Sequence, residues 1–398
     1  MTTERIAVIG AGIIGLAIGR RLAQLQSGAQ VTVIEKEAII GAHQTSHNSG
    51  VVHAGIYYSP DSLKAMLCKR GSALLREYCA EKGIVYDECG KLIIAIDDSE
   101  SIALNRIHER AKRNRVDGLR LVGAEGIREL EPHAVGVAGL HSPRTAITDY
   151  SAVARAFADD IVVAGGSILL GHSVSAISSQ LNAVALQIGN DELVFDRVVI
   201  CAGLQSDFVA RLAGDEVEPA IIPFRGEYFQ LVASKKDLIR GLIYPLPDPK
   251  YPFLGVHFTR RVDGEVVVGP NAVLALAREG YQRRDLNPKD LLETLRWPGF
   301  QKLARSHWKM GMSELIGSFS KHQFLNRARA YVPELQDGDV IPSGSGVRAQ
   351  AVDRDGTLVE DFRIHRLGKV IAVRNAPSPG ATSSLAIAEY ICEELLKR

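Results

Sequence analysis

The sequence has little of what several protein classes require. Its 398 residues include 5 cysteines, an odd number, with no Cys-x-x-Cys pair and no His/Cys cluster at zinc spacing. The apolar run from Ile6 to Gly19 is too short to cross a bilayer and is followed by two arginines. Lysine and arginine total 47 against 46 aspartates and glutamates. We therefore expect a reduced, cytoplasmic protein without a metal and without nucleic-acid binding through bulk charge.

The remaining composition is that of an ordinary folded protein. Hydrophobic residues make up 46% and charged residues 23%, which argues against a disordered or coiled-coil chain. At roughly 150 residues per domain, the length predicts two or three structural units. Buried-type strands are expected at 6–9, 31–34, 161–173, 197–202 and 369–373. Alternation with turn signals predicts an antiparallel sheet between about 215 and 270, and residues 286–332 have a helical pattern.

Residues 6–35 have the pattern of a dinucleotide-binding βαβ unit. Gly10, Gly12 and Gly15 follow a strand and open a helix, and Glu35 ends the second strand. The first glycine permits a tight turn, the second lets a pyrophosphate approach the backbone, and the third lets helix and strand pack closely. The helix N-terminus would face the phosphates, and Glu35 would accept hydrogen bonds from ribose hydroxyls. This motif alone does not separate NAD from FAD.

Three other segments favour FAD over a nicotinamide cofactor. Residues 41–58, GAHQTSHNSGVVHAGIYY, are small and polar, and such residues let backbone amides approach a ring or a pyrophosphate. Residues 197–203, RVVICAG, are a buried strand that ends in small residues. Residues 379–383, PGATS, open the last helix, whose positive end would face an electron-rich ring. A nicotinamide-only dehydrogenase leaves these segments without a role.

These motifs together resemble the FAD-dependent D-amino-acid-oxidase-like family of the glycine-oxidase type. Within that family, the run from His43 to Tyr58 is similar to L-2-hydroxyglutarate dehydrogenases and oxidases. The stretches PFRGEY (223–228), GVHFT (255–259) and GVR (346–348) are similar to them too. The resemblance covers essentially the full length. One departure is Ser46, where the family pattern more often has glycine.

The resemblance implies a two-domain flavoprotein that is α/β, and α+β overall. A Rossmann-like FAD-binding domain of residues 1–80, 145–212 and 338–398 would be interleaved with an antiparallel-sheet substrate domain of residues 81–144 and 213–337. The isoalloxazine of an extended FAD would lie at their junction. The implied FAD contacts are Gly10, Gly12, Ile14, Gly15, Glu35, Lys36, Thr45, Ser46, Asn48, Ser49, Val174, Ala202, Gly203, Arg348, Gly380, Ala381 and Thr382.

The implied reaction is oxidation of L-2-hydroxyglutarate, a 2-hydroxy dicarboxylate, to 2-oxoglutarate. Hydride would pass from C2 to flavin N5, and the electrons would go on to quinone or to oxygen. A quinone acceptor would bring the protein to the inner face of the cell membrane as a peripheral protein. The sequence does not address the oligomeric state.

Such a reaction needs a base for the hydroxyl proton, and histidine suits this because its pKa lies near neutrality. His53 is the first candidate, since the resemblance places its segment beside the isoalloxazine. Its alternatives are a hydrogen bond to a loop carbonyl, or a covalent flavin link as in dimethylglycine- and sarcosine-dehydrogenase relatives. His257 is the second candidate, since strand alternation puts it with Thr259, a candidate substrate contact, on a polar face. A solvent-facing His257 is equally consistent. His43 and His47 are expected to order their loop.

Arginine presents a planar fork that matches a carboxylate, so arginines are the expected substrate clamps. Arg348 is predicted to contact both substrate and flavin. Arg225 is a second candidate, with a structural ion pair to Glu227 as the alternative. Tyr57 and Tyr244 are candidates to donate their hydroxyls to the substrate, or else are core aromatic residues.

Two basic helical segments have simpler interpretations. Residues 106–115 are expected to form a solvated face. Residues 302–312 carry Trp308 among basic side chains, a pattern that can rest on an anionic membrane surface. For Trp308 we favour packing in the core.

Two other functions stay open. An amine or amino-acid oxidase of the same fold would depend less on His53, because a neutral amine needs no base. An FAD-containing assembly or tRNA-modifying subunit would turn over no free small molecule. Rapid flavin reduction by a small acid would exclude this second function.

Overall fold

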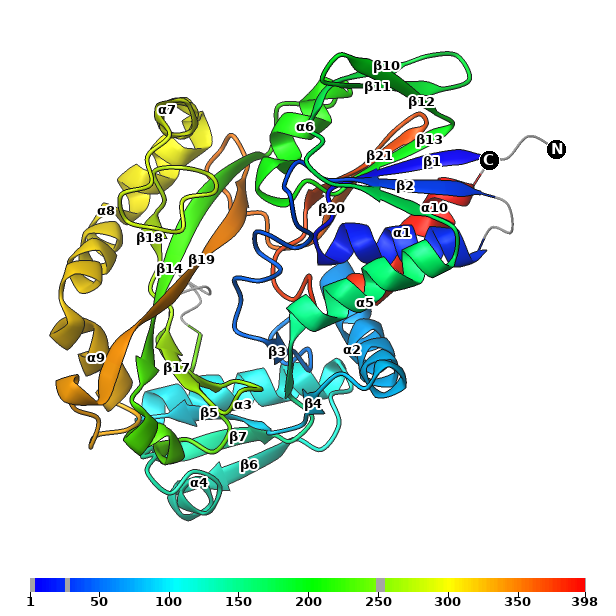
Figure 1. The fold of residues 1–398 in the computed structure, drawn as a ribbon. Helices are drawn as coiled ribbons and strands as arrows, with labels where there is room; N and C mark the ends of the chain where they lie inside the picture. Colours follow the sequence, from blue (N-terminus) through cyan, green and yellow to red (C-terminus); the bar gives the residue numbers. More distant parts are fainter. Residues whose placement is uncertain (1–3, 26–28, 248–254, 398) are drawn as a thin grey trace.

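The computed structural model describes residues 4–25, 29–247 and 255–397. One sheet contains the βαβ unit predicted at the N-terminus, in the strand order β20-β21-β13-β1-β2-β9 (Figure 1). All neighbours in it are parallel except β20, which pairs with β21 in the antiparallel sense. Its strands are β1 (Arg5–Ile9), β2 (Gln30–Ile34), β9 (Ser167–Leu169), β13 (Arg197–Ile200), β20 (Arg363–Leu367) and β21 (Val370–Asn375). The strand expected at 161–173 is shorter than predicted, because residues up to Val163 continue a helix.

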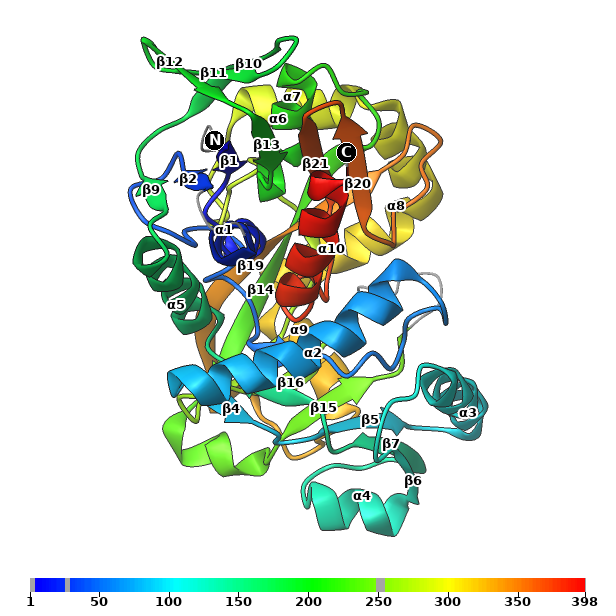
Figure 2. The ribbon, with the colours of Figure 1, turned by 90° about the vertical axis from the view of Figure 1, so that its right-hand side faces the viewer.

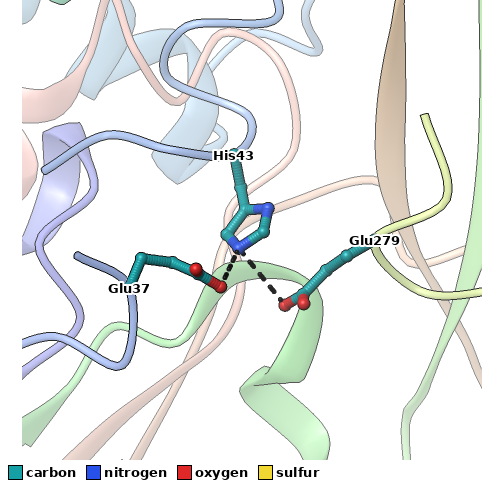
Figure 3. A group of neighbouring side chains, drawn as sticks. All are labelled: Glu37, His43 and Glu279. Carbon is teal, nitrogen blue, oxygen red and sulfur yellow. Dashed lines mark hydrogen bonds and ion pairs between the residues drawn. The ribbon is translucent and has the colours of Figure 1, made fainter. Parts of the chain in front are cut away.

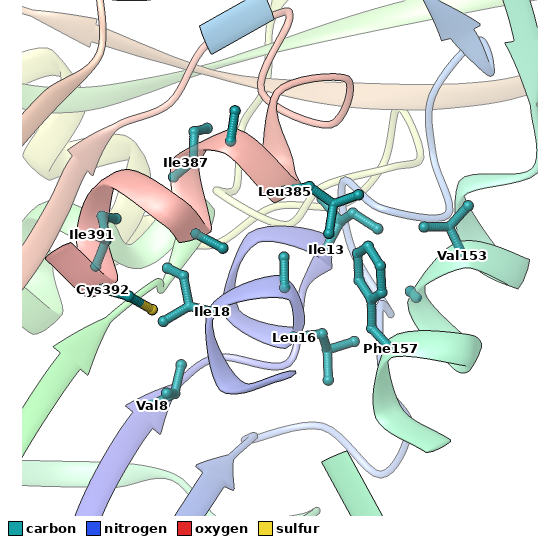
Figure 4. Packing of buried hydrophobic residues seen from close by; sticks show 14 of the residues in the cluster. Val8, Ile13, Leu16, Ile18, Val153, Phe157, Leu385, Ile387, Ile391 and Cys392 are labelled. Carbon is teal, nitrogen blue, oxygen red and sulfur yellow. The ribbon is translucent and has the colours of Figure 1, made fainter. Parts of the chain in front are cut away.

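Three helices pack on one face of this sheet: α1 (Ile13–Leu25), α5 (Tyr150–Val163) and α10 (Ser384–Leu396). Leu16 and Ile18 of α1 lie between Phe157 of α5 and Ile391 of α10, and all four side chains are fully buried (Figure 4). Each such side chain contributes about 1.5–3 kcal/mol when it is fully buried. The cluster therefore holds α1, and with it the glycine-rich turn, in a fixed position against the sheet.

The opposite face of the sheet packs on a small antiparallel sheet and a short helix. Strand alternation sends Val8 toward the helices and Ala7 and Ile9 toward this second layer. The layer consists of β10 (Val174–Ser179), β11 (Val184–Ile188), β12 (Asp191–Phe195) and α6 (Ser206–Leu212).

The largest sheet of the described residues has the order β18-β14-β17-β16-β15-β5-β7-β6, and β19 pairs with β14. It is antiparallel except between β15 and β5. The antiparallel sheet predicted at 215–270 is thus present, and strands from residues 91–142 and 340–352 extend it. The domain boundaries stay a prediction. The strands are β5 (Lys91–Ala95), β6 (Arg120–Gly123), β7 (Ala138–Ser142), β14 (Ala220–Leu231), β15 (Leu242–Pro245), β16 (His257–Arg260), β17 (Val266–Gly269), β18 (Val273–Leu274) and β19 (Val340–Val352).

A short sheet and one long helix link the two large sheets. The short sheet joins β3 (Val51–Val52), β8 (Ala146–Thr148) and β4 (Tyr86–Asp87), and α2 (Leu63–Lys82) crosses between the large sheets (Figure 2). Residues 41–50, just before β3, form turns, as expected for the small polar segment. All five cysteines are free.

The outer helices confirm the helical pattern predicted for residues 286–332 and correct the prediction for Trp308. In Figure 1, α7 (Pro288–Arg296), α8 (Pro298–Phe319) and α9 (Lys321–Arg329) lie outside the long strands β14 and β19. The backbone of α8 is interrupted at His307, and Trp308 is 61% exposed, so the prediction of core packing is wrong. Trp297 is the buried tryptophan, and its Nε1 donates to the carbonyl of Val352 at 3.0 Å.

The basic segment 106–115 lies on α3 (Asp98–Arg113) and the two residues that follow it, and its lysine and arginine side chains are exposed as predicted. The remaining helix is α4 (Ala124–Leu130). No helix of the described residues is both long enough and apolar enough to cross a bilayer.

Candidate functional site

A cavity of about 500 Å³ opens where β1, β2 and β13 end, at the carboxyl edge of the parallel sheet. Ligands of open α/β sheets bind at this edge. Two predicted FAD contacts, Ser46 and Arg348, are not among its lining residues. The Ser46 hydroxyl instead lies 3.2 Å from the carbonyl of His43 within its own turn. The predicted contacts that do line the cavity are Gly10, Gly12, Ile14, Gly15, Glu35, Lys36, Thr45, Asn48, Ser49, Val174, Ala202, Gly203, Gly380, Ala381 and Thr382.

The glycines of the first turn differ in what surrounds them. Gly10 has φ +105°, and a Cβ there would lie 2.4 Å from the carbonyl oxygen of Cys201. A Cβ on Gly15 would lie 1.9 Å from the carbonyl oxygen of Gly10. At Gly12 the nearest atom would be Thr45 Oγ1 at 3.5 Å, so a side chain would enter the open cavity. A tight turn, a close helix–strand contact and an open cradle are what a bound dinucleotide requires.

The polar groups around this turn are already oriented by the backbone. Glu35 is 9% exposed, and its carboxylate accepts hydrogen bonds from the amides of Ala11 at 2.7 Å and Glu37 at 2.9 Å. Each carboxylate oxygen keeps a lone pair for a ribose hydroxyl. Thr45 Oγ1 accepts from the amide of Ile13 at 2.9 Å, at the first residue of α1. The residues therefore fit an extended FAD.

Glu37, His43 and Glu279 form a group beside the cavity that has the residue types of a metal site (Figure 3). His43 Nε2 lies 3.0 Å from Glu37 Oε1 and 3.6 Å from Glu279 Oε1. The ammonium of Lys36 also bonds to Glu37, and it lies 2.9 Å from Glu279. Burial lowers the pKa of Lys36, but the bonds to these carboxylates outweigh it and raise that pKa. The lysine thus supplies the positive charge, and the group is an ion-pair network.

His53 lines the cavity at the end nearest the large sheet. Its backbone amide donates to Thr382 Oγ1 at 3.1 Å, and its Nε2 lies 3.2 Å from Ser378 Oγ. The ring nitrogen therefore contacts a hydroxyl, not the loop carbonyl considered as an alternative. Burial, together with the charges of Lys91 and Lys64, lowers the pKa of His53 to about 3. The imidazole is consequently neutral in the free site, and the charge of a bound anionic substrate would raise its pKa and let it accept a proton.

His257 is the first residue of β16, and its ring stacks on Tyr244 with centroids 4.0 Å apart. Its Nδ1 lies 3.0 Å from the carbonyl oxygen of Gly255. A carbonyl only accepts, so Nδ1 carries the proton and Nε2 has the free lone pair. Burial lowers the pKa of His257 to about 3. The ring is half-buried rather than solvent-facing, and Thr259 on the same strand is 1% exposed.

The two predicted arginine clamps have different surroundings. Arg225 is 6% exposed, and its Nη2 lies 3.2 Å from Glu227 Oε1, so the structural ion pair is present. The side chain of Arg348 reaches solvent although protein surrounds it on most sides, and this desolvation lowers its pKa. Its positive charge contributes to the lowered pKa of both His53 and His257. Arg348 is therefore the arginine that the fold brings to the two histidines.

Two lysines of the site, Lys64 and Lys91, are not among the candidates predicted from the sequence, and Lys91 is the first residue of β5. It is 2% exposed, and its Nζ lies 3.7 Å from the ring centroid of Tyr244 and 4.8 Å from that of Tyr57. Burial lowers the pKa of Lys91 to about 7. A signal was present in the sequence, because KLIIA (91–95) is a buried-type strand that begins with a lysine.

These side chains form a cationic site next to the cavity. The pKa of His53 is lowered by the positive charges of three residues, Lys64, Lys91 and Arg348. Of these, Lys64 donates to the carbonyl of Glu360 at 2.8 Å, and burial lowers its pKa to about 8. The phenol oxygen of Tyr57 is buried and has no hydrogen-bond partner among the described residues. Neutral imidazoles between cations suit an anionic substrate that must lose a proton.

Comparison with known proteins agrees with the cavity and its glycine-rich turn. Residues 5–394 match the model of a family described as FAD dependent oxidoreductase. The chain belongs to this family. FAD is accordingly its cofactor, and the chain is an FAD-dependent oxidoreductase.

Similar proteins support this membership along the whole chain. An L-2-hydroxyglutarate dehydrogenase of Indibacter alkaliphilus is 44% identical over 395 residues, which are 99% of each chain. The mitochondrial L-2-hydroxyglutarate dehydrogenase of Homo sapiens is 43% identical over 99% of this chain and 89% of its own.

Among solved structures, L-alpha-glycerophosphate oxidase from Mycoplasma pneumoniae with FAD bound has a TM-score of 0.81 at 21% identity. It covers 100% of this chain and 96% of its own. Glycine oxidase from Geobacillus kaustophilus has a TM-score of 0.73 at 18% identity, over 99% of this chain and 95% of its own. This FAD-dependent oxidoreductase therefore shares their fold.

Proposed function

We propose that this FAD-dependent oxidoreductase oxidises L-2-hydroxyglutarate to 2-oxoglutarate. The observation that carries the proposal is the cationic site at the end of the FAD cavity, where Lys91 and Arg348 flank two neutral histidines. A substrate with two carboxylates and one hydroxyl suits this combination of charges and bases. The similarity to L-2-hydroxyglutarate dehydrogenases over essentially the whole chain supports the same substrate.

In this proposal His53 is the base, because it lines the cofactor cavity and also lies within reach of the cations. It accepts the C2 hydroxyl proton as the carbonyl of the product forms. Bound FAD supplies the two-electron acceptor that takes the hydride from C2. Arg348 holds the carboxylate at C1, and its charge favours the developing alkoxide.

The other predicted contacts have secondary parts in this proposal. His257, next to Tyr244, has its unprotonated Nε2 as the second candidate to accept the C2 hydroxyl proton. The Tyr57 hydroxyl donates to the substrate. Thr259 and Arg225 support this wall of the site from β16 and β14. The cavity residues described above hold FAD, with Glu35 on the ribose.

The test is the absorbance of the flavin in the purified holoenzyme under anaerobic conditions. We expect L-2-hydroxyglutarate to bleach it rapidly, and the D-isomer, malate, lactate and glycine to bleach it little. Bleaching by glycine or another amine in place of the hydroxy acid would assign the chain to the amine oxidases. No bleaching by any of these compounds would favour the non-catalytic alternative.

We further propose that the enzyme binds an anionic membrane surface through α8 and delivers its electrons to quinone there. Successive turns of this helix expose Trp308, Met312, Leu315, Ile316 and Phe319, with exposed fractions between 43% and 73%. Exposed apolar side chains in one contiguous run mark an interaction surface. Lys302, Arg305 and Lys309 are exposed on the same helix and supply the charge that an anionic headgroup attracts.

Sedimentation with phosphatidylglycerol vesicles tests this second proposal. We expect the holoenzyme to bind these vesicles, and the double variant W308S/F319S to stay in the supernatant with unchanged flavin reduction. A matched control is L181S, because Leu181 is 93% exposed at the turn between β10 and β11. Equal sedimentation of W308S/F319S and L181S would contradict the proposal.

A further inference from the structure

The buried ammonium of Lys91 has no counter-ion among the residues that the structure describes. Among the ion pairs and hydrogen bonds of the described residues, none involves its side-chain nitrogen. It instead lies against the faces of Tyr244 and Tyr57, at 3.7 and 4.8 Å from their ring centroids. Cation–π contacts of this kind hold an ammonium in place while leaving its N–H groups free to donate. A buried charge without a partner is costly to a fold and marks a functional site.

We infer that Lys91 binds the carboxylate of the substrate that is remote from the reacting carbon, and thereby selects a dicarboxylate. This inference rests on the proposed function and names the residue that reads its second charge. The oxidised carbon must lie at the FAD cavity, beside His53. Lys91 belongs to the other wall, on β5 of the large sheet, which places a cation beyond the reacting carbon.

The other cations near the site have competing partners or positions. Arg225 is paired with Glu227, which also accepts from Arg283 Nε at 2.6 Å. Lys64 donates to the carbonyl of Glu360. Arg348 has the role of holding the carboxylate at C1. Of these four cations, Lys91 is therefore the one that we expect to pair with the remote carboxylate of the substrate.

The neighbours of Lys91 have the chemistry of a carboxylate site. The phenol oxygen of Tyr57 is buried without a hydrogen-bond partner among the described residues, and a carboxylate oxygen would satisfy it. Ile93 and Ala95, which share the face of β5 with Lys91, are fully buried and pack with Tyr57 and Tyr244 in one apolar cluster. A charge-assisted hydrogen bond is strong in such surroundings, since water does not compete for it.

The experiment compares two substrates that differ only in the remote charge: L-2-hydroxyglutarate and its 5-amide. We expect K91M to lower kcat/KM for the diacid about 10- to 150-fold, the usual value of a hydrogen bond to a charged group. The same variant should change kcat/KM for the 5-amide less than about threefold, so most of the wild-type preference for the diacid disappears. K91R, which keeps the charge, should retain part of that preference. K91Q provides a second neutral variant, and bound FAD reports that each variant is folded.

K64M is the matched control, since Lys64 is also a desolvated lysine near His53. We expect K64M to change kcat/KM for the diacid and for the 5-amide by the same factor. An unchanged preference for the diacid in K91M and K91Q would overturn the inference, as would an equal loss for both substrates.

A binding measurement separates this inference from the proposed function. Glutarate carries the two carboxylates but no hydroxyl, and its binding to the oxidised holoenzyme is followed through the flavin spectrum. We expect K91M to weaken glutarate binding by the same 10- to 150-fold. If L-2-hydroxyglutarate fails to reduce the flavin but glutarate binding depends on Lys91, the proposed function fails and the dicarboxylate site stands. If L-2-hydroxyglutarate reduces the flavin but glutarate binds wild type and K91M equally, the proposed function stands and the dicarboxylate site at Lys91 fails.

Discussion

Replacing His53 with asparagine tests the proposed base directly. Asparagine can still hydrogen-bond to Ser378, but it cannot take the hydroxyl proton. A positioned general base contributes about 10²- to 10⁴-fold to a rate, so the rate constant for flavin reduction should fall by a factor in this range. FAD should stay bound, because His53 is one of many side chains that line the cavity.

The lowered pKa of His53 also predicts how strongly kcat/KM of the wild-type enzyme depends on pH. An unshifted histidine has a pKa near 6.5 and would be only about 3% neutral at pH 5. Burial and nearby cations lower the pKa of His53 to about 3, which leaves the base about 99% neutral at that pH. Since kcat/KM reports the free enzyme, we expect it to change by no more than about twofold between pH 7 and pH 5, where an unshifted histidine would cost about 25-fold.

The assay is anaerobic stopped-flow reduction of the flavin by L-2-hydroxyglutarate from pH 5 to pH 9. H47N is the control, because His47 is exposed and stacks on Tyr281 at a centroid distance of 4.0 Å. An acid limb near pH 6.5 that disappears in H53N would refute the desolvated environment of His53. A larger loss of rate in H257N than in H53N would transfer the role of base to His257.

Three further predictions concern binding and stability. Gly10→Ala should abolish FAD binding, because the clash with Cys201 and the strain of φ +105° each cost about 1–3 kcal/mol. Asp215→Ala should lower the free energy of unfolding by about 3–5 kcal/mol, because it leaves the fully buried Arg374 without a carboxylate. Lys91→Met should raise the Tm of the ligand-free enzyme at pH 7 and remove a decline in kcat/KM above that pH. The folded pKa of Lys91, about 7, lies below its ordinary 10.5, so the unfolded chain binds more protons and the lysine destabilises the fold.

Each of these predictions has a measurement that can contradict it. FAD content after gel filtration decides the first, with Gly123→Ala as the control because nothing lies within 4 Å of its added Cβ. Chemical denaturation decides the second, and a loss below 1 kcal/mol would show that the Arg374 charge is solvated in another way. Thermal unfolding and a pH series of kcat/KM decide the third. A lower Tm for Lys91→Met, or an alkaline limb that persists, would contradict it.

Local features of the sequence determined the cofactor site. Gly10, Gly12, Gly15 and Glu35 lie within one βαβ unit, whose spacing follows from the geometry of a strand, a turn and a helix. Interactions between neighbours in the chain dominate there, so the motif alone places the FAD cavity. Residues 41–50 were predictable as turns for the same reason, because their small and polar residues favour turns. The buried strand β3 that follows them was not predicted.

The substrate wall was decided by tertiary structure. His53, Lys91, His257 and Arg348 come from four separate strands or loops. The pairings of β5 with β15, β15 with β16, β16 with β17, β17 with β14 and β14 with β19 bring the last three into one sheet. His53 lies outside that sheet, and its amide is held by Thr382. Strand pairing over such separations depends on the packing of both sheets, which no local pattern specifies. The same reason explains Trp308: its helical pattern gave a helix, but only the fold of β14 and β19 decided which face of α8 met solvent.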